Sequence, residues 1–293
     1  MDLLRTRSEL EAWRGARGGQ SCVLVPTMGG LHAGHADLIR RGAELARQSE
    51  TPGACIVSVF VNPTQFDEPS DYERYPRDLD EDVGVCVEHG AEAVFAPEVD
   101  EVFPSPESRQ PPPLPAAAQD QGLEDRFRPG HFEGVCLVVR RLFELVRPSA
   151  AIFGEKDWQQ YRVIRQMAER DQLGIEVIPA PTVREDDGLA MSSRNRFLAP
   201  EHRLAAAAMP RALRAARLSD DPDPAAEAMR GALLDAGLGI DYAEIRDAET
   251  LSDWNPERPG RAIIAARLGD VRLLDNAAWP GDGSGLAFGG DSA

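Results

Sequence analysis

The chain has 293 residues, 42% apolar and 28% charged, which is enough for one large domain or two ordinary ones around a hydrophobic core. Its net charge of −17 at pH 7 should repel nucleic acids and anionic membranes, so any anionic substrate needs a local positive pocket. No apolar run is long enough to cross a bilayer and the charged first residues do not form a secretory signal, which favours the cytoplasm.

Strands and helices alternate through the first part of the chain. Short apolar runs bounded by turn residues predict buried parallel strands, and apolar residues at helical spacing predict helices between them. The strands are expected at 21–26, 54–61, 91–96, 150–153 and 175–178, and the helices at 34–48, 78–89, 132–147 and 158–173. Repeated β-α-β units of this kind predict an α/β fold with a doubly wound, Rossmann-like parallel sheet.

The pattern changes at about residue 182, where we expect a second, smaller α+β domain. Its predicted elements are alanine-rich helical stretches at 200–218 and 224–236 and strand-like segments at 240–245 and 262–274. The expected division is a Rossmann-like domain at 1–182, a C-terminal lid domain at 183–279 and a disordered Gly- and Ser-rich tail at 280–293.

The basic residues are almost all arginine, because Lys156 is the single lysine among 32. A GC-rich genome would account for this composition. Life in concentrated salt, where acidic and lysine-poor surfaces are common, is a second hypothesis. Full activity and stability in dilute buffer would count against it.

The first candidate site is the strand-turn-helix segment from Pro26 to His35, which reads PTMGGLHAGH. Ligands bind at the carboxyl ends of strands in open α/β sheets, and a helix N-terminus offers N–H groups and a positive dipole end to phosphate. His32 and His35 fall on one side of the first helical turn, from which both imidazoles can donate to phosphate oxygens. The segment predicts an ATP-binding turn, and the plain alternative is that the histidines only cap a helix.

Two later segments carry further polar groups of the kind that bind phosphate. The first, GEKD at 154–157, contains Lys156, whose compact charge suits a migrating phosphoryl group. The second, MSSR at 191–194, combines two hydroxyls and a guanidinium, which suit a mobile phosphate clamp or simply a solvated turn. Gln65 and Gln160 could bind a hydroxyl or carboxylate through their amides, although glutamine is more often a surface residue.

Together these segments resemble the pantoate–β-alanine ligases (pantothenate synthetases) of the nucleotidylyltransferase superfamily with the HxGH motif. The matching stretches are PTMGGLHAGH at 26–35, FVNPTQF at 60–66, YPRDLDED at 75–82, RPGHFEGV at 128–135, FGEKDWQQ at 153–160, DGLAMSSRN at 187–195 and GDVRLLDN at 269–276. The resemblance implies a homodimer that uses Mg²⁺ and ATP to activate (R)-pantoate as pantoyl adenylate, releasing pyrophosphate. The amine of β-alanine then displaces AMP to form pantothenate.

The resemblance also implies roles for individual residues. His35, His32, Lys156 and Arg194 would be catalytic, and Gln65 and Gln160 would hold pantoate. ATP would be bound by Met28, Gly29, Gly30, Leu31, His32, Ala33, Gly34, His35, Gly154, Glu155, Lys156, Asp157, Val183, Met191, Ser192, Ser193 and Arg194.

Three points stay open under this resemblance. Glu81 and Asp82 lie near where relatives place acidic groups around magnesium, but a solvated acidic first turn of a helix explains them at least as well. Arg128 and His131 would order either the loop beside the site or the dimer interface. Asp125 stands where the family often has glycine, which leaves the local backbone shape undecided.

Two other functions remain as alternatives. Another small-molecule adenylyltransferase could share the turn, but the paired glutamines and the GEKD segment argue against it. A non-catalytic nucleotide sensor needs affinity alone, so it would have no use for the histidines, Lys156 and Arg194 as transition-state donors.

Overall fold

A computed structural model describes residues 1–48, 53–66 and 69–280 of the chain. It contains two compact units. The first consists of Met1–Gly154 and Val163–Ala180, and the second of Glu155–Arg162 and the chain from Pro181 onward. A boundary at residue 182 between a nucleotide-binding domain and a lid stays a prediction. The predicted disordered tail lies, apart from Pro280, outside the described residues.

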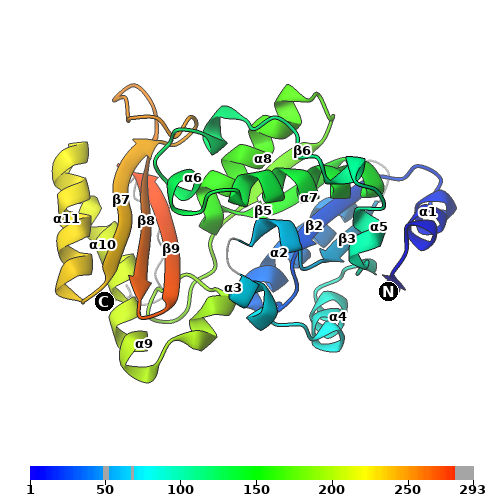
Figure 1. Ribbon diagram of the computed structural model, residues 1–293, viewed down its shortest axis with the longest axis horizontal. Coiled ribbons are helices and arrows are strands. Elements are labelled where there is room, and N and C mark those ends of the chain that lie inside the picture. Colours follow the sequence, from blue (N-terminus) through cyan, green and yellow to red (C-terminus); the bar gives the residue numbers. More distant parts are fainter. Residues whose placement is uncertain (49–52, 67–68, 281–293) are drawn as a thin grey trace. The chain divides into compact units, whose positions relative to one another are not determined.

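The first unit is built on a six-stranded parallel sheet in the order β1-β4-β3-β2-β5-β6. The strands are β1 Asp2–Leu4, β2 Cys22–Thr27, β3 Ala54–Val59, β4 Ala93–Phe95, β5 Ala150–Gly154 and β6 Glu176–Ala180 (Figure 1). From β2 the chain moves outward to β3 and β4, and it then continues on the other side with β5 and β6. The doubly wound parallel sheet is therefore confirmed, and its strand order reverses between β2 and β5, where such sheets bind ligands.

Helices connect these strands. They are α1 Arg7–Ala16, α2 Ala33–Gln48, α3 Pro69–Arg74, α4 Leu79–Glu88, α5 Val99–Val102, α6 Glu124–Phe127, α7 His131–Val146 and α8 Trp158–Arg170. On one face of the sheet, side chains of α2 and α4 pack with Val25 and Val57. Leu24 and Ile56 alternate with these residues, so they point to the other face, and both are fully buried. Both faces of the sheet are thus covered, as a parallel sheet requires.

All four cysteines are free and buried. Burial raises the pKa of Cys22 to about 11 and the pKa of Cys86 and Cys136 to about 12. These thiols therefore stay protonated at neutral pH and pack as small apolar groups.

The N-terminal helix α1 was absent from the sequence expectations. The Thr6 side chain accepts a hydrogen bond from the Glu9 amide at 3.2 Å, and the Glu9 carboxylate accepts one from the Thr6 amide at 3.0 Å. This reciprocal pair is a capping box, and its Thr-x-x-Glu signature was readable in the sequence. Leu10 and Trp13 on the buried face of the helix then hold it in place.

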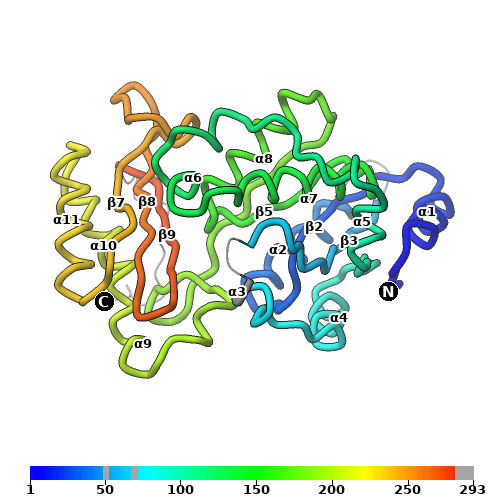
Figure 2. The backbone as a smooth tube through the Cα atoms, in the orientation of Figure 1, coloured from blue at the N-terminus to red at the C-terminus, as the bar shows by residue number. Residues whose placement is uncertain are grey.

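The second unit contains an antiparallel sheet in the order β7-β8-β9. Its elements are β7 Gly239–Asp247, β8 Gly260–Leu268, β9 Val271–Trp279 and the helices α9 Pro200–Ala206, α10 Ala208–Ala216 and α11 Pro222–Asp235, whose path Figure 2 follows. Met209, Met229, Ile264 and Trp279 belong to one buried cluster that joins the helices to the sheet. The expected smaller α+β part is confirmed.

The helical stretch expected at 200–218 is two helices, α9 and α10. The break follows from Pro210, which has no amide hydrogen to donate to the carbonyl of Ala206 and whose ring would clash with that carbonyl in a continuous helix. In the first turn of α10, where an amide needs no partner inside the helix, the proline is tolerated.

Gly134 in α7 provides a test of the packing that supports Gln65. A Cβ at this position would lie 2.3 Å from the Thr64 carbonyl oxygen and 2.7 Å from the Gln65 Cα, so the backbone would have to shift. We expect Gly134→Ala to lower the free energy of unfolding by about 1–3 kcal/mol, the usual cost of overpacking, as measured by urea denaturation. Gly84→Ala in α4 is the control: its Cβ meets nothing within 4 Å, and it should stabilise by about 0.5–1 kcal/mol. Equal effects of the two substitutions would contradict the close approach of α7.

Candidate nucleotide-binding site

The turn after β2 depends on two glycines in the left-handed region of backbone conformation. Gly29 has φ of +82° and Gly30 has φ of +62°. A Cβ on Gly29 would lie 2.7 Å from a carboxylate oxygen of Asp82, and one on Gly30 would lie 3.2 Å from Pro76. Conformation and space therefore both require glycine here, independently of any ligand.

Asp82, on the first turn of α4, holds this turn. Its Oδ2 accepts a hydrogen bond from the Gly30 amide at 3.1 Å and its Oδ1 accepts one from the Leu31 amide at 2.7 Å. The residue is 2% exposed, so the reading of Asp82 as a solvated acid is wrong, whereas Glu81 is exposed. Burial raises the pKa of Asp82, while the two amides act in the opposite direction. Because these amides face Asp82, Gly30 and Leu31 would have to contact a nucleotide through other atoms.

His32 and His35 lie together at the start of α2, with ring centroids 4.1 Å apart. The Nδ1 of His32 accepts from the Gly34 amide at 3.1 Å, and the Nδ1 of His35 accepts from the His32 amide at 3.3 Å. A neutral imidazole that accepts at Nδ1 carries its proton on Nε2. Each ring therefore presents Nε2–H as its donor, which is the group that a phosphate oxygen would need.

Gln65 is tied to the same turn within the first unit. Its amide nitrogen lies 2.7 Å from the Met28 sulfur, and its amide oxygen accepts from the Asn62 side chain at 3.2 Å. Asn62 also donates to the Gly134 carbonyl at 3.1 Å, and its oxygen caps the 3-10 turn Pro63–Gln65. Asn62 is a residue whose role the sequence analysis missed, although Asn before Pro is a helix-start signal.

Arg128 and His131 order the loop that carries Gln65. The Arg128 guanidinium cannot accept, so it donates to the His131 Nε2 at 3.1 Å. The neutral ring then carries its proton on Nδ1 and donates to the Gln65 carbonyl at 3.1 Å. This arrangement favours the reading that Arg128 and His131 order the loop beside the site.

Asp125, at the position where the resemblance led us to expect glycine, accepts three hydrogen bonds. Its carboxylate accepts from the amides of Gln121, Gly122 and Leu123 at 3.0, 3.1 and 3.0 Å. The side chain thus fixes the backbone just before α6, and the local backbone shape that the sequence left undecided is defined by these bonds.

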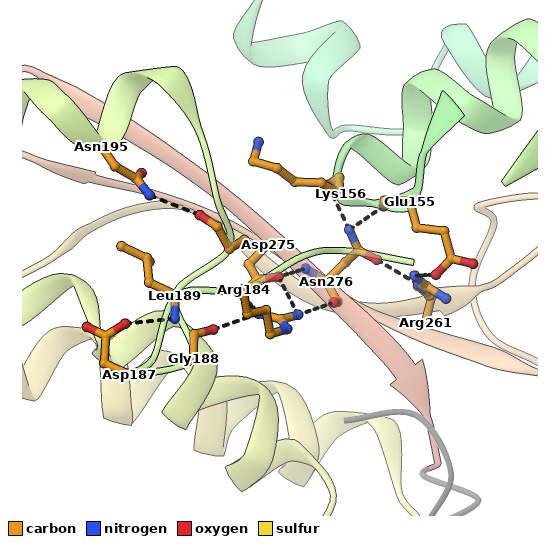
Figure 3. Close-up of polar contacts among 11 residues, drawn as sticks. Glu155, Lys156, Arg184, Asp187, Gly188, Leu189, Asn195, Arg261, Asp275 and Asn276 are labelled. Carbon is orange, nitrogen blue, oxygen red and sulfur yellow. Dashed lines mark hydrogen bonds and ion pairs between the residues drawn. The ribbon is translucent and has the colours of Figure 1, made fainter. Parts of the chain in front are cut away.

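The GEKD segment spans the end of β5 and the beginning of the second unit. Gly154 ends β5 in the first unit, and Glu155–Asp157 form a 3-10 turn in the second unit that leads into α8. The Lys156 ammonium lies 3.4 Å from the Asp157 carboxylate. The carbonyls of Glu155 and Lys156 accept from the side chain of Asn276 on β9 (Figure 3). Gln160 follows on α8 and is half-buried.

The MSSR segment belongs to the second unit and is joined to Val183. The Met191 amide donates to the Val183 carbonyl at 2.9 Å. The Ser192 hydroxyl accepts from the Arg194 amide at 3.2 Å and so caps the 3-10 helix Ser193–Phe197. Asn195 adds a bond from its side chain to the Glu185 carboxylate at 2.6 Å. The loop is therefore held by its own polar groups, and the Ser192 hydroxyl is already used as a cap.

Each unit thus collects part of the predicted site. The first places His32, His35 and Gln65 around one turn, and the second places Lys156 and the segment from Val183 to Arg194 beside β9. Among the described residues, no group of three or more His, Cys, Asp or Glu side chains could hold a metal ion. None of the described helices is long and apolar enough to span a membrane.

Asp82 gives the first unit a pH-dependent contribution to stability. Because burial raises its pKa above the ordinary value of 3.8, this contribution is fully present below that value and is lost as the pH rises through the folded-state pKa. We therefore expect the unfolding free energy of the unmodified protein, minus that of Asp82→Asn, to fall as the pH rises from mildly acidic to neutral. Urea denaturation across a pH series measures this difference, with Glu81→Gln on the same turn as the control. A stability difference that stays flat or rises with pH would contradict the raised pKa of the buried Asp82 carboxyl.

Nearly the whole chain matches known proteins of one family. The model of the pantoate-beta-alanine ligase family matches residues 2–278. A pantothenate synthetase from Nocardioides sp. is 46% identical over 284 residues, which cover 94% of this chain and 84% of the relative. The alignment with one from Rubrobacter xylanophilus is 303 positions long at 45% identity, and it covers 95% of this chain and 98% of the relative.

Solved structures show the same likeness. The crystal structure of pantothenate synthetase from Thermus thermophilus has a TM-score of 0.85 at 41% identity and covers 94% of this chain and 98% of its own. The pantoate-beta-alanine ligase from Francisella tularensis, complexed with beta-gamma ATP and beta-alanine, has a TM-score of 0.76 at 30% identity and covers 94% and 97%.

Proposed function

The chain belongs to the pantoate–β-alanine ligase family, and from this premise we propose that it condenses (R)-pantoate with β-alanine at the expense of ATP. Pantoyl adenylate is the intermediate, and pyrophosphate and AMP are the products beside pantothenate. The observation that carries the proposal is the histidine pair at the start of α2, where each Nδ1 accepts from a backbone amide and so leaves the proton of a neutral ring on Nε2. A helix cap uses only the Nδ1 atoms, whereas the proposal assigns Nε2–H of each ring to the phosphate oxygens.

The first step would transfer the adenylyl group. A carboxylate oxygen of pantoate attacks the α-phosphorus, the bond to the bridging oxygen breaks, and pyrophosphate leaves. Negative charge grows on the phosphate oxygens during this step, and the histidines are the donors assigned to it. Lys156 and Arg194 would stabilise the leaving pyrophosphate, and Gln65 and Gln160 would hold the pantoate.

In the second step the adenylate would stay in the position in which it was formed. The neutral amine of β-alanine attacks the acyl carbon of the adenylate, the acyl–oxygen bond to AMP breaks, and the amine loses its proton. No covalent bond to the protein forms, so proximity and electrostatic stabilisation carry most of the rate. The remaining assigned residues, from Met28 to His35, Gly154 to Asp157, Val183 and Met191 to Arg194, would contact ATP.

Magnesium would enter as the complex with ATP. Mg²⁺ bound with ATP typically takes most of its ligands from substrate phosphates and water, with one or two carboxylates, a mode that needs no dedicated metal cluster in the protein. The ion would supply positive charge to the triphosphate. Homodimerisation and a cytoplasmic location are further parts of the proposal that rest on the family, and sedimentation analysis tests the first of them.

Product formation tests the proposed activity. With ATP, Mg²⁺, pantoate and β-alanine, we expect pantothenate, AMP and pyrophosphate in equal amounts, and with β-alanine omitted only pyrophosphate equivalent to bound adenylate. Tight ATP binding without turnover would favour a nucleotide sensor. Pyrophosphate release that does not depend on pantoate would favour a different adenylyltransferase.

The role of His35 has its own test. We expect His35→Ala to lower turnover by about 100-fold or more, the size typical of losing one transition-state donor. The control is His89→Ala, which removes an imidazole at the C-terminal end of α4, where its Nδ1 contacts the Val85 carbonyl oxygen. It should leave turnover within about threefold, as is usual outside a site. Near-normal turnover of His35→Ala would remove His35 from the mechanism.

A further inference from the structure

The GDVRLLDN stretch at 269–276 has no role in the proposed function, yet it places two buried polar residues within β9. Asp275 is 1% exposed and Asn276 is 3% exposed. Buried polar groups are costly unless they are hydrogen-bonded, so the partners of these two side chains show what they stabilise.

The Asn276 side chain uses both its donor and its acceptor atoms. Its Nδ2 donates to the Glu155 carbonyl at 2.9 Å and to the Lys156 carbonyl at 2.8 Å. Its Oδ1 accepts from the Arg261 Nε at 2.7 Å. One amide group therefore holds two successive carbonyls of the turn that carries Lys156. In Figure 3 the Lys156 side chain leaves that turn away from Asn276.

Arg261 closes the arrangement from the neighbouring strand β8. Its Nη2 donates to the Glu155 carboxylate at 2.9 Å, and its guanidinium lies 3.6 Å from the ring centroid of Trp158. Asn276 fixes the peptide carbonyls on either side of the Lys156 Cα, and Arg261 fixes the Glu155 side chain. Little freedom is left at the base of Lys156.

Asp275, next along β9, acts in the same way on the other loop. Its two oxygens accept from the Arg184 guanidinium at 2.7 and 2.9 Å, and Arg184 also donates to the Gly188 carbonyl at 3.0 Å. The bidentate pair fixes orientation as well as distance. Two successive residues of β9 thus anchor the turn that carries Lys156 and, through Arg184, the loop that leads to Met191–Arg194.

We propose that Asn276 is a positioning residue for Lys156: its carboxamide sets the backbone of the 155–156 turn and through it the place of the ammonium. The proposal rests on the proposed function for the role of Lys156. The asparagine side chain itself need not touch substrate. A carboxylate at 276 could still accept from Arg261 but would set oxygens against both carbonyls, so Asn276→Asp separates the two functions of the side chain.

The single lysine of the chain allows a direct test. Reductive ¹³C-methylation labels Lys156 and the α-amino group of the chain. We expect Asn276→Asp to shift or broaden the Lys156 signal and to change its response to ATP in the full chain. Asp241→Asn is the matched control, because it weakens ion pairs with Arg267 and Arg272 in the same sheet away from the turn. A Lys156 signal unchanged in Asn276→Asp, or changed equally in Asp241→Asn, would overturn the proposal.

Kinetics supply the second readout. Asn276→Asp and Asn276→Ala should lower kcat by about 10- to 100-fold, the scale of a misplaced reacting group, with less effect on the KM for pantoate. In a Lys156→Ala background the further loss should be below about threefold, because residues that act through one another are not additive. Equal losses in both backgrounds would show a merely structural role and overturn the proposal. Failure of the proposed function would be seen separately, as absence of pantothenate from the unmodified chain, and the labelled lysine would still report on Asn276.

Discussion

The bond between the Asp82 carboxylate and the amides of Gly30 and Leu31 is the interaction on which the candidate site depends. The turn after β2 bends through two left-handed glycines, and this conformation directs two amides inward, away from water. Buried amides need acceptors, and a carboxylate from α4 supplies both. The cost of burying that carboxylate is visible in its raised pKa. The histidine pair that follows is therefore presented from a backbone already fixed before any nucleotide arrives.

A similar constraint recurs at two other segments that carry proposed ligand contacts. Asn62 and His131 bond the side chain and the carbonyl of Gln65, and Asn276 bonds the turn at Lys156. At both segments a polar side chain from another element, His131 on α7 or Asn276 on β9, helps to hold the loop. Loops supply function because they can present backbone and side-chain groups, and they keep a defined shape only where their buried polar groups are satisfied. This arrangement pre-organises a site and reduces the entropy lost on binding.

The arginine-rich composition has a structural counterpart. Arg184 binds both oxygens of Asp275, Arg261 bonds Glu155 and packs on Trp158, and Arg128 bonds His131. A planar guanidinium with donors in fixed directions suits such orientation tasks. Lys156 differs: its ammonium is a compact charge at the end of a flexible stem, and the surrounding structure fixes its base instead of its head. In a chain of net charge −17, such local cations are what an anionic substrate would encounter.

Sequence alone determined the parallel sheet, the smaller α+β part and the turn from Pro26 to His35, because these depend on apolar periodicity, strand-end position and local backbone chemistry. The same local rules, applied further, account for α1 through its capping box and for the break between α9 and α10 through Pro210. The roles of Asp82, Asp275 and Asn276 were decided only by tertiary structure. Asp82 reaches the turn across 52 residues of sequence and Asn276 reaches Lys156 across 120. A buried hydrogen bond leaves no trace in the spacing of either partner, since its geometry exists only once the fold brings the two together.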